Sequence, residues 1–241
     1  YMISTVEKDT VRAGNIVEIV RPDGNSLTHI VLAIDDPVLW LADTLVVALS
    51  DLSPVSHRSH QRNAAVVVQF QTGRAQGWLR LENGDTVKID SPLPKPTYNA
   101  ADFDFLVRAS DLRQGTRIEL TGFSLGLNSI VPLRGRVTGT DSVAGHLCWV
   151  FAGTNGTVPV RFWIDQETRE LRRQLIHLGG GYQLLKTNRP RGERVPLTEE
   201  ERGGMVLDST GLRHSVFGFV VPFPSREFEP SSACRRSRCS S

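Results

Sequence analysis

The sequence of 241 residues lacks an uncharged apolar run long enough to form a transmembrane helix, and it has only three cysteines. Cys148, Cys234 and Cys239 are too few for the disulfide framework of a small secreted domain. The first ten residues carry charges and no apolar segment, so we expect no signal peptide there. These absences indicate a globular chain, long enough for one large domain or two small ones, that a hydrophobic core stabilises.

Lysine is scarce as well, and the two signs of charge are nearly balanced. The sequence has 28 lysines and arginines against 26 acidic residues, a net charge of +2, and only four of the basic residues are lysines. A nearly neutral chain is not a polyanion-binding protein by bulk electrostatics. The one local basic cluster lies between Cys234 and Cys239. We predict that 226–241 is a flexible, Arg-rich tail that is solvated.

What the sequence has in abundance is alternation of apolar with polar residues. A period of two over short runs bounded by turn residues is the pattern of β-strands, and several runs are rich in β-branched residues. The segments with this character are Asn15–Arg21, Leu27–Ile34, Thr44–Leu49, Ala64–Phe70, Trp78–Glu82, Asp85–Ile89, Phe103–Arg108, Thr116–Thr121, His146–Phe151, Val158–Ile164, Tyr182–Lys186 and Val216–Phe223.

Two turns indicate hairpins between these segments. Pro22–Asn25 combines a proline that presets φ with a glycine that accepts a positive φ. Asn83–Gly84 lies between two alternating runs, which is typical of a two-residue type I′ turn. Only Gln166–Gln174 and Thr198–Arg202 have helix-forming character. We therefore predict an all-β fold, an antiparallel β-sandwich, jelly-roll or β-barrel, with at most one or two short helices.

A proline-rich segment divides the chain. Three prolines fall within Ser91–Pro96, and such a stretch favours an extended backbone. We predict a β-rich segment over 1–90, a linker or inter-strand crossing over 91–100, and a second β-rich segment over 101–225. The two β-rich segments form either one continuous domain or two.

The sharpest catalytic motif is Gly122–Gly126, which fits the G-x-S-x-G pattern around Ser124. In α/β-hydrolases that serine lies on a strained turn from a strand into a helix. Here Pro132 prevents the following segment from forming that helix, and no βαβ units surround the motif. We therefore interpret Ser124 as part of a tight, glycine-flanked turn. Three histidines follow the motif in the sequence, but any histidine late in the chain would do so, and their order is no evidence of a catalytic triad: His146, His177 and His214.

Candidate ligands for a metal or cofactor are sparse. His57 and His60 flank Arg58, whose charge opposes a dication, and the nearest acid is Asp51, so we predict a solvated loop. We predict no catalytic, cofactor-binding or metal-binding residues, no cofactor and no enzymatic activity. We interpret Asp35–Asp36 as a turn and Gly179–Gly181 as a hairpin bend, and Asn155–Thr157 is a glycosylation sequon. Cys234 and Cys239 have no histidine nearby, so we expect no zinc site there. The four tryptophans either pack in the core or stack on sugars: Trp40, Trp78, Trp149 and Trp163.

The second half of the sequence carries a resemblance to a known family. Val158–Asp165, Glu167–Leu171 and Gly180–Tyr182 are followed by Asp208–Ser209 and Phe217–Phe219. Over residues 158–223 this order resembles the end of the protruding domain of a calicivirus capsid protein. The resemblance implies a chain of antiparallel strands, with a hairpin turn at Asp165–Arg169 in place of a helix. Asp102–Phe105 separately looks like the D-F-x-F strand that ends many jelly-roll shells of picorna-like viruses.

This resemblance implies a structural capsid protein of a non-enveloped positive-strand RNA virus, located in the virion. Its partners would be copies of itself and other capsid subunits, RNA through the Arg-rich tail, and a host receptor or glycan. The alternative is a secreted or cell-surface β-sandwich that binds glycan or protein ligands through its loops and exposed tryptophans. A third hypothesis is a hydrolase that uses Ser124.

Overall fold

The computed structural model describes residues 2–6, 10–34, 41–61, 64–179 and 182–188, and within them the all-β prediction is confirmed. One short α-helix and one turn of 3-10 helix accompany the strands. The elements are β1 (Met2–Val6), β2 (Thr10–Asp23), β3 (Ser26–Ile34), β4 (Leu41–Ala48), β5 (Pro54–Gln61), β6 (Ala64–Gln71), β7 (Arg74–Leu81), β8 (Thr86–Pro92), β9 (Tyr98–Asn99), η1 (Ala100–Asp102), α1 (Phe103–Ala109), β10 (Arg117–Ser124), β11 (Ser129–Val143), β12 (His146–Asn155), β13 (Val158–Asp165), β14 (Leu171–Gly179) and β15 (Tyr182–Thr187).

Several predicted segments lie outside the described residues. They are the strand Val216–Phe223, the helical segment Thr198–Arg202, the tail 226–241 with Cys234 and Cys239, the turn Asp35–Asp36, Trp40 and His214.

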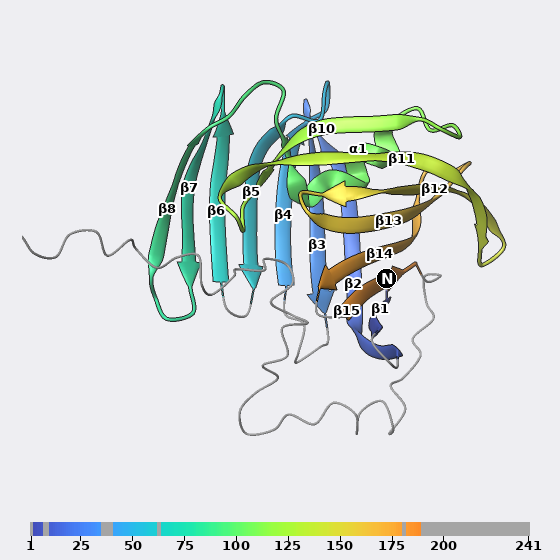
Figure 1. Cartoon of the computed structure of the whole chain (residues 1–241). Helices are drawn as coiled ribbons and strands as arrows, with labels where there is room; N and C mark the ends of the chain where they lie inside the picture. The colour runs from blue at the N-terminus through green and yellow to red at the C-terminus, as the bar shows by residue number, and fades with distance from the viewer. Residues whose placement is uncertain (1, 7–9, 35–40, 62–63, 180–181, 189–241) are drawn as a thin grey trace, which may run out of the picture.

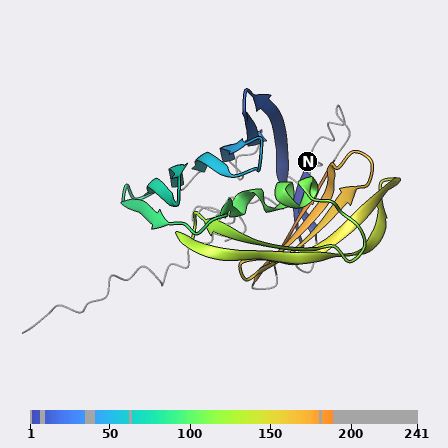
Figure 2. The same cartoon turned by 90° about the horizontal axis from the view of Figure 1, so that it is seen from above.

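The strands form one sheet that is folded into two layers. β1 to β8 follow one another along the sheet, and β15 back to β9 continue it beyond β1. Neighbouring strands are antiparallel except for the parallel pair of β9 and β10. Figure 1 shows β10 to β15 crossing in front of β2 to β6, and Figure 2 shows the two layers from above with α1 between them. The architecture is therefore a two-layer β-sandwich built from a meander.

The proline-rich segment connects the free edges of the two layers. β8 ends at Pro92, the Lys95–Pro96 peptide bond is cis, and β9 pairs with β10 through Tyr98 and Asn99. The chain thus passes from β8, at one edge of the sheet, to β9, at the other. This crossing leads directly into η1 and α1, which it places between the layers (Figure 2).

The predicted strand over Phe103–Arg108 is wrong, because these residues form α1. Alternation puts Phe103, Phe105 and Val107 on one face, but the buried hydrophobic residues are Phe103, Leu106 and Val107, which have helical spacing. The Asn99 side chain begins the helical segment by accepting a hydrogen bond from the N–H of Ala101. A short amphipathic run satisfies both periods, and here the tertiary packing selects the helix.

Phe103 anchors α1 to the second layer. Its ring makes edge-to-face contacts with Phe151 on β12 and Phe162 on β13, with centroid separations of 5.7 and 5.8 Å. Phe151 and Phe162 are themselves stacked, and all three rings are buried. A second core lies between β6 to β8 and the end of β10, where Phe123 is fully buried beside Val66 and Val68. These two clusters hold the layers together on either side of the space between them.

Two predicted turns have different outcomes. The turn at Asp165–Arg169 is confirmed, because β13 ends at Asp165 and β14 begins at Leu171, which excludes the alternative helix over Gln166–Gln174. The β7–β8 hairpin is also confirmed, but its two-residue type I′ turn is wrong. Four residues connect these strands, and only Gly84 among them has a positive φ. The turn is therefore wider than two residues, and Asn83 lacks the positive φ that a type I′ turn requires at both of its central residues.

Gly135 on β11 is required by the close approach of β12. A Cβ atom at this position would lie 2.5 Å from the carbonyl oxygen of Ala152 and 2.5 Å from the ring of Phe151. We expect Gly135→Ala to lower the free energy of unfolding by about 2 kcal/mol, because the buried ring and the backbone must move. Gly139, on the same strand, has open space around its Cβ position. Gly139→Ala should change stability by less than about 0.5 kcal/mol in the same denaturant titration, and equal losses would contradict this account.

Candidate functional site

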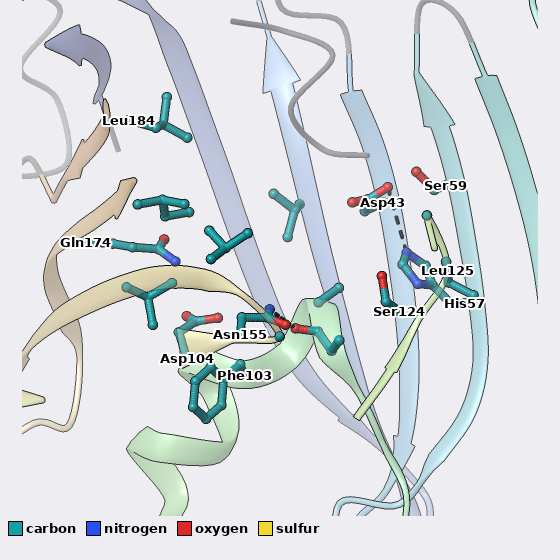
Figure 3. Close-up of a pocket in the computed structure, with 18 of the residues that line it drawn as sticks. Asp43, His57, Ser59, Phe103, Asp104, Ser124, Leu125, Asn155, Gln174 and Leu184 are labelled. Carbon is teal, nitrogen blue, oxygen red and sulfur yellow. Dashed lines mark hydrogen bonds and ion pairs between the residues drawn. The ribbon is translucent and has the colours of Figure 1, made fainter. Parts of the chain in front are cut away.

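A cavity of about 350 Å³ lies between the two layers, next to η1 and α1. Both layers contribute apolar side chains to it, including Ile16, Val31 and Leu41 from the first layer and Ile176 and Leu184 from the second. Figure 3 shows this space with Leu184 and Gln174 on one side and Asp43 and His57 on the other. Its volume lies within the range of small-molecule binding sites.

The alternation of the first layer also directs polar side chains into this cavity. Strand pairing places Glu18 opposite Val31, Val31 opposite Asp43, and Asp43 opposite Ser59. Residues that are opposite one another in neighbouring strands share a face, so this row carries Glu18, Asp43 and Ser59 on the inner face. All three line the cavity, and Asp43 and Ser59 are buried.

Glu18 forms a buried ion pair with Lys186 of β15. The Lys186 Nζ donates a hydrogen bond to Oε1 of Glu18, and the side chains are 9% and 8% exposed. Burial raises the pKa of Glu18, but the charge and hydrogen bond of Lys186 outweigh it and hold the pKa below its usual value. This contact joins the two layers at the wall of the cavity.

His57 and Asp43 form a second polar cluster. Nε2 of His57 lies 3.9 Å from Oδ1 of Asp43, and Nδ1 of His57 lies 2.9 Å from Nδ2 of Asn99. Figure 3 shows Asp43 and His57 directed toward each other from β4 and β5. Neither Nε2 of His57 nor Oδ1 of Asp43 has a hydrogen-bond partner, although both atoms are buried.

The third polar cluster links β3 to the helical segment. Nδ1 of His29 is 3.2 Å from Oδ1 of Asp102, and the His29 ring stacks on Phe105. Burial lowers the pKa of His29, but the hydrogen bond to Asp102 and the charges of Asp102, Asp104 and Glu18 outweigh it and raise the pKa above 6.5. Burial also raises the pKa of Asp104, whose Oδ2 has no hydrogen-bond partner and which lines the cavity.

Ser124 lines the same cavity, but its contacts are those of a turn. It is the last residue of β10, and its Oγ accepts a hydrogen bond of 3.4 Å from the N–H of Leu127. The interpretation of Gly122–Gly126 as a tight turn is wrong in its bounds, because Gly122 and Ser124 belong to β10 and the turn follows over residues 125–128. Within the described residues no hydrogen bond joins Ser124 to His57, although a serine nucleophile needs a base at that distance.

The predicted solvated loop around His57 and His60 is wrong. Both histidines lie on β5, where alternation turns His57 into the cavity and leaves His60 and Arg58 exposed on the outer face. Because the two imidazoles face opposite sides of the sheet, they do not converge. Among the residues that the structure describes, no group of three or more His, Cys, Asp or Glu side chains is arranged to hold a metal ion.

The structure also shows the contacts and the burial of the remaining candidate residues. Asn155 of the sequon donates a hydrogen bond of 2.8 Å to the carbonyl oxygen of Ala100, so its amide is already engaged. Cys148 is buried and free. Trp163 is buried and Trp78 and Trp149 are half-buried, so these three rings pack against the protein. The β14–β15 hairpin connects Gly179 to Tyr182 through residues outside the described part of the chain. No helix of the described residues is long and apolar enough to cross a membrane.

Sequence reasoning missed Glu18, His29, Asp43 and Lys186 as polar groups of the interior. One signal was available on β4, where Asp43 shares the inner face with Leu41, Leu45 and Val47. A charged residue at an inward position of an otherwise apolar strand is expensive unless it has a partner or a ligand. Glu18 offered the same signal on β2.

A family model described as "Protein of unknown function (DUF3108)" matches residues 1–179, which include every described element from β1 to β14. No curated protein matches the sequence.

The ion pair between Glu18 and Lys186 predicts a strong response to removal of one partner. We expect Lys186→Met to lower the free energy of unfolding by about 3 to 5 kcal/mol, because Glu18 would remain buried without its counter-charge. The double variant Glu18→Leu/Lys186→Met should recover most of that loss. Arg113→Met, which removes the exposed ion pair with Asp111, should leave the melting temperature unchanged. A double variant as unstable as Lys186→Met would contradict this explanation.

The contact between His29 and Asp102 predicts a dependence on pH. A raised pKa means that the contribution of His29 to stability is present below pH 6.5 and is lost as the pH rises through the raised value. In an NMR titration of the imidazole protons, we expect Asp102→Asn to lower the pKa of His29. Asp111→Asn, which changes an exposed carboxylate, should leave that pKa as it is. The explanation fails if both variants titrate like the wild type.

Proposed function

The chain belongs to the DUF3108 family, and since the description of that family states no function, we propose one from the cavity: the protein binds a small amphipathic molecule between its two layers. The apolar body of this ligand lies against the aliphatic side chains of both layers, and its polar group meets the buried polar side chains.

The observation that carries this proposal is the combination of an unfilled apolar space with buried, unpartnered polar atoms. Protein interiors are normally packed to high density, so a space of about 350 Å³ lined by Val31, Leu41, Ile176 and Leu184 is unusual. Buried polar atoms are normally hydrogen-bonded as well. Both departures coincide in one place, and a ligand of mixed polarity would satisfy both.

The functions predicted from the sequence have less support than ligand binding in the cavity. Assembly as a capsid subunit and location in the virion stay predictions, and one of the motifs behind them, Asp102–Phe105, is helical. Glycan binding through exposed tryptophans finds no such side chain among the described residues, where Trp163 is buried and Trp78 and Trp149 are half-buried. Among the residues that the structure describes, no base is hydrogen-bonded to Ser124, although the hydrolase hypothesis requires one. The cavity therefore supports the binding function best.

A cavity-filling substitution tests the proposal. A neutral apolar dye such as phenylnaphthylamine should bind the full chain with a rise in fluorescence, and Leu184→Trp should weaken that binding by at least tenfold, because the indole occupies the cavity. Leu147, on β12, is 56% exposed and lies outside the cavity. Leu147→Trp is thus a matched control that should bind the dye like the wild type.

Thermal unfolding of both variants shows whether the fold persists. If the folded wild-type protein binds no dye, or if both tryptophan variants bind it equally well, the cavity is not a ligand site and the proposal is wrong.

A further inference from the structure

We propose that the polar group of the ligand is a neutral group that both donates and accepts a hydrogen bond, of which an alcohol hydroxyl is the smallest, and that it binds between His57 and Asp43. This inference rests on the proposed function and names the chemical class of its ligand. It follows from the direction of each hydrogen bond around the His57 ring.

The orientation of the Asn99 amide is set by the backbone. Oδ1 of Asn99 accepts a hydrogen bond of 3.0 Å from the N–H of Ala101, so the other amide atom, Nδ2, is the one that faces His57. Nδ2 of Asn99 is a donor only, and it lies 2.9 Å from Nδ1 of His57. Nδ1 must therefore accept this hydrogen bond with its lone pair. The neutral ring consequently carries its proton on Nε2.

Nε2 of His57 is thus a donor, and it has an acceptor beside it that it does not reach. The distance of 3.9 Å to Oδ1 of Asp43 is too long for a hydrogen bond. The two side chains are only 4% and 8% exposed, and neither atom has another hydrogen-bond partner. Both residues line the cavity. The wall of the cavity therefore presents one unsatisfied donor next to one unsatisfied acceptor.

This pair discriminates among polar groups by their hydrogen-bonding capacity. A hydroxyl oxygen accepts from Nε2–H of His57 and donates its own proton to the carboxylate of Asp43. An ammonium group has no lone pair with which to accept from His57. A carboxylate has no proton to donate and is repelled by Asp43. A charged head group of either sign therefore leaves one buried protein atom unsatisfied, which lowers affinity.

The surroundings of the pair are apolar, as the body of such a ligand requires. Leu41 and Leu45 lie two residues to either side of Asp43 on the same face of β4. Val31 is opposite Asp43 on β3, and Val66 is opposite Ser59 on β6. An alkyl chain attached to the hydroxyl is thus in contact with aliphatic side chains within one residue spacing of the polar pair.

The same tautomer explains why Ser124 does not complete a catalytic triad. A general base needs a free lone pair directed at the serine, and the only lone pair of the neutral His57 ring is occupied by Asn99. His57 is arranged to donate a hydrogen bond into the cavity and not to accept a proton there.

Three probes with the same alkyl chain test the assignment. Calorimetric titration of the full chain at neutral pH with octanol, octylamine and octanoate compares a hydroxyl, an ammonium and a carboxylate. We expect octanol to bind at least tenfold more tightly than either charged probe. Equal affinities, or tighter binding of a charged probe, would overturn the inference.

Substitutions of His57 assign the effect to the residue. His57→Leu should weaken octanol binding by roughly tenfold while the neutral dye still binds, because the donor to the ligand is lost and the wall of the cavity stays apolar. His57→Gln should restore most of the affinity, because its amide oxygen can accept from Asn99 while its NH₂ donates to the ligand. His60→Leu, on the outer face of the same strand, is the matched control and should bind octanol like the wild type.

The outcomes separate this inference from the proposed function. If the dye binds but octanol shows no preference, or if His57→Leu binds octanol like the wild type, the assignment of the hydroxyl is wrong and the cavity remains a binding site. If neither dye nor octanol binds, both fail.

Discussion

The pairing of β1 with β15 is the constraint on which the rest of the structure depends. Met2–Val6 runs antiparallel to Gln183–Thr187, and this ladder joins strands that are about as far apart in the chain as the described residues allow. Without it, the meander from β2 to β8 and the meander from β10 to β14 would be separate sheets. With it, they are one sheet whose inner faces meet, and Lys186 of β15 is brought to Glu18 of β2.

Two hydrophobic clusters and the ion pair between Glu18 and Lys186 hold the layers together around the cavity. Phe103 with the rings of β12 and β13 forms one cluster, and Phe123 with the side chains of β6 to β8 forms the other. The space that remains between these clusters is lined by both aliphatic and polar residues. Burial of so many polar groups opposes folding unless they are partnered. Here some are paired within the chain, and others, His57 and Asp43 among them, are arranged to be completed by a ligand.

Much of the fold follows from the local pattern, and much of the site does not. Alternation on β4 and β6 and the glycine of the β7–β8 turn predict strands and hairpins correctly, because pleat and turn geometry are local. The strand predicted over Phe103–Arg108 failed because a run of six residues fits a helix equally well. Likewise, the spacing of His57 and His60 cannot reveal that the first faces inward, because a strand has two faces and only the partner layer decides which is buried.

The sequence by itself determined that this chain would be a β-protein, since a period of two is a property of the backbone. It also located several strands, such as Leu27–Ile34 and Ala64–Phe70, whose bounds lie within one residue of those of β3 and β6. Only the tertiary structure decided that Asp43, His57 and Asn99 would meet, because they come from β4, β5 and β9, and their contact depends on strand register and on the crossing after β8. The direction of one hydrogen bond, from Asn99 to His57, then gives the cavity its chemical preference.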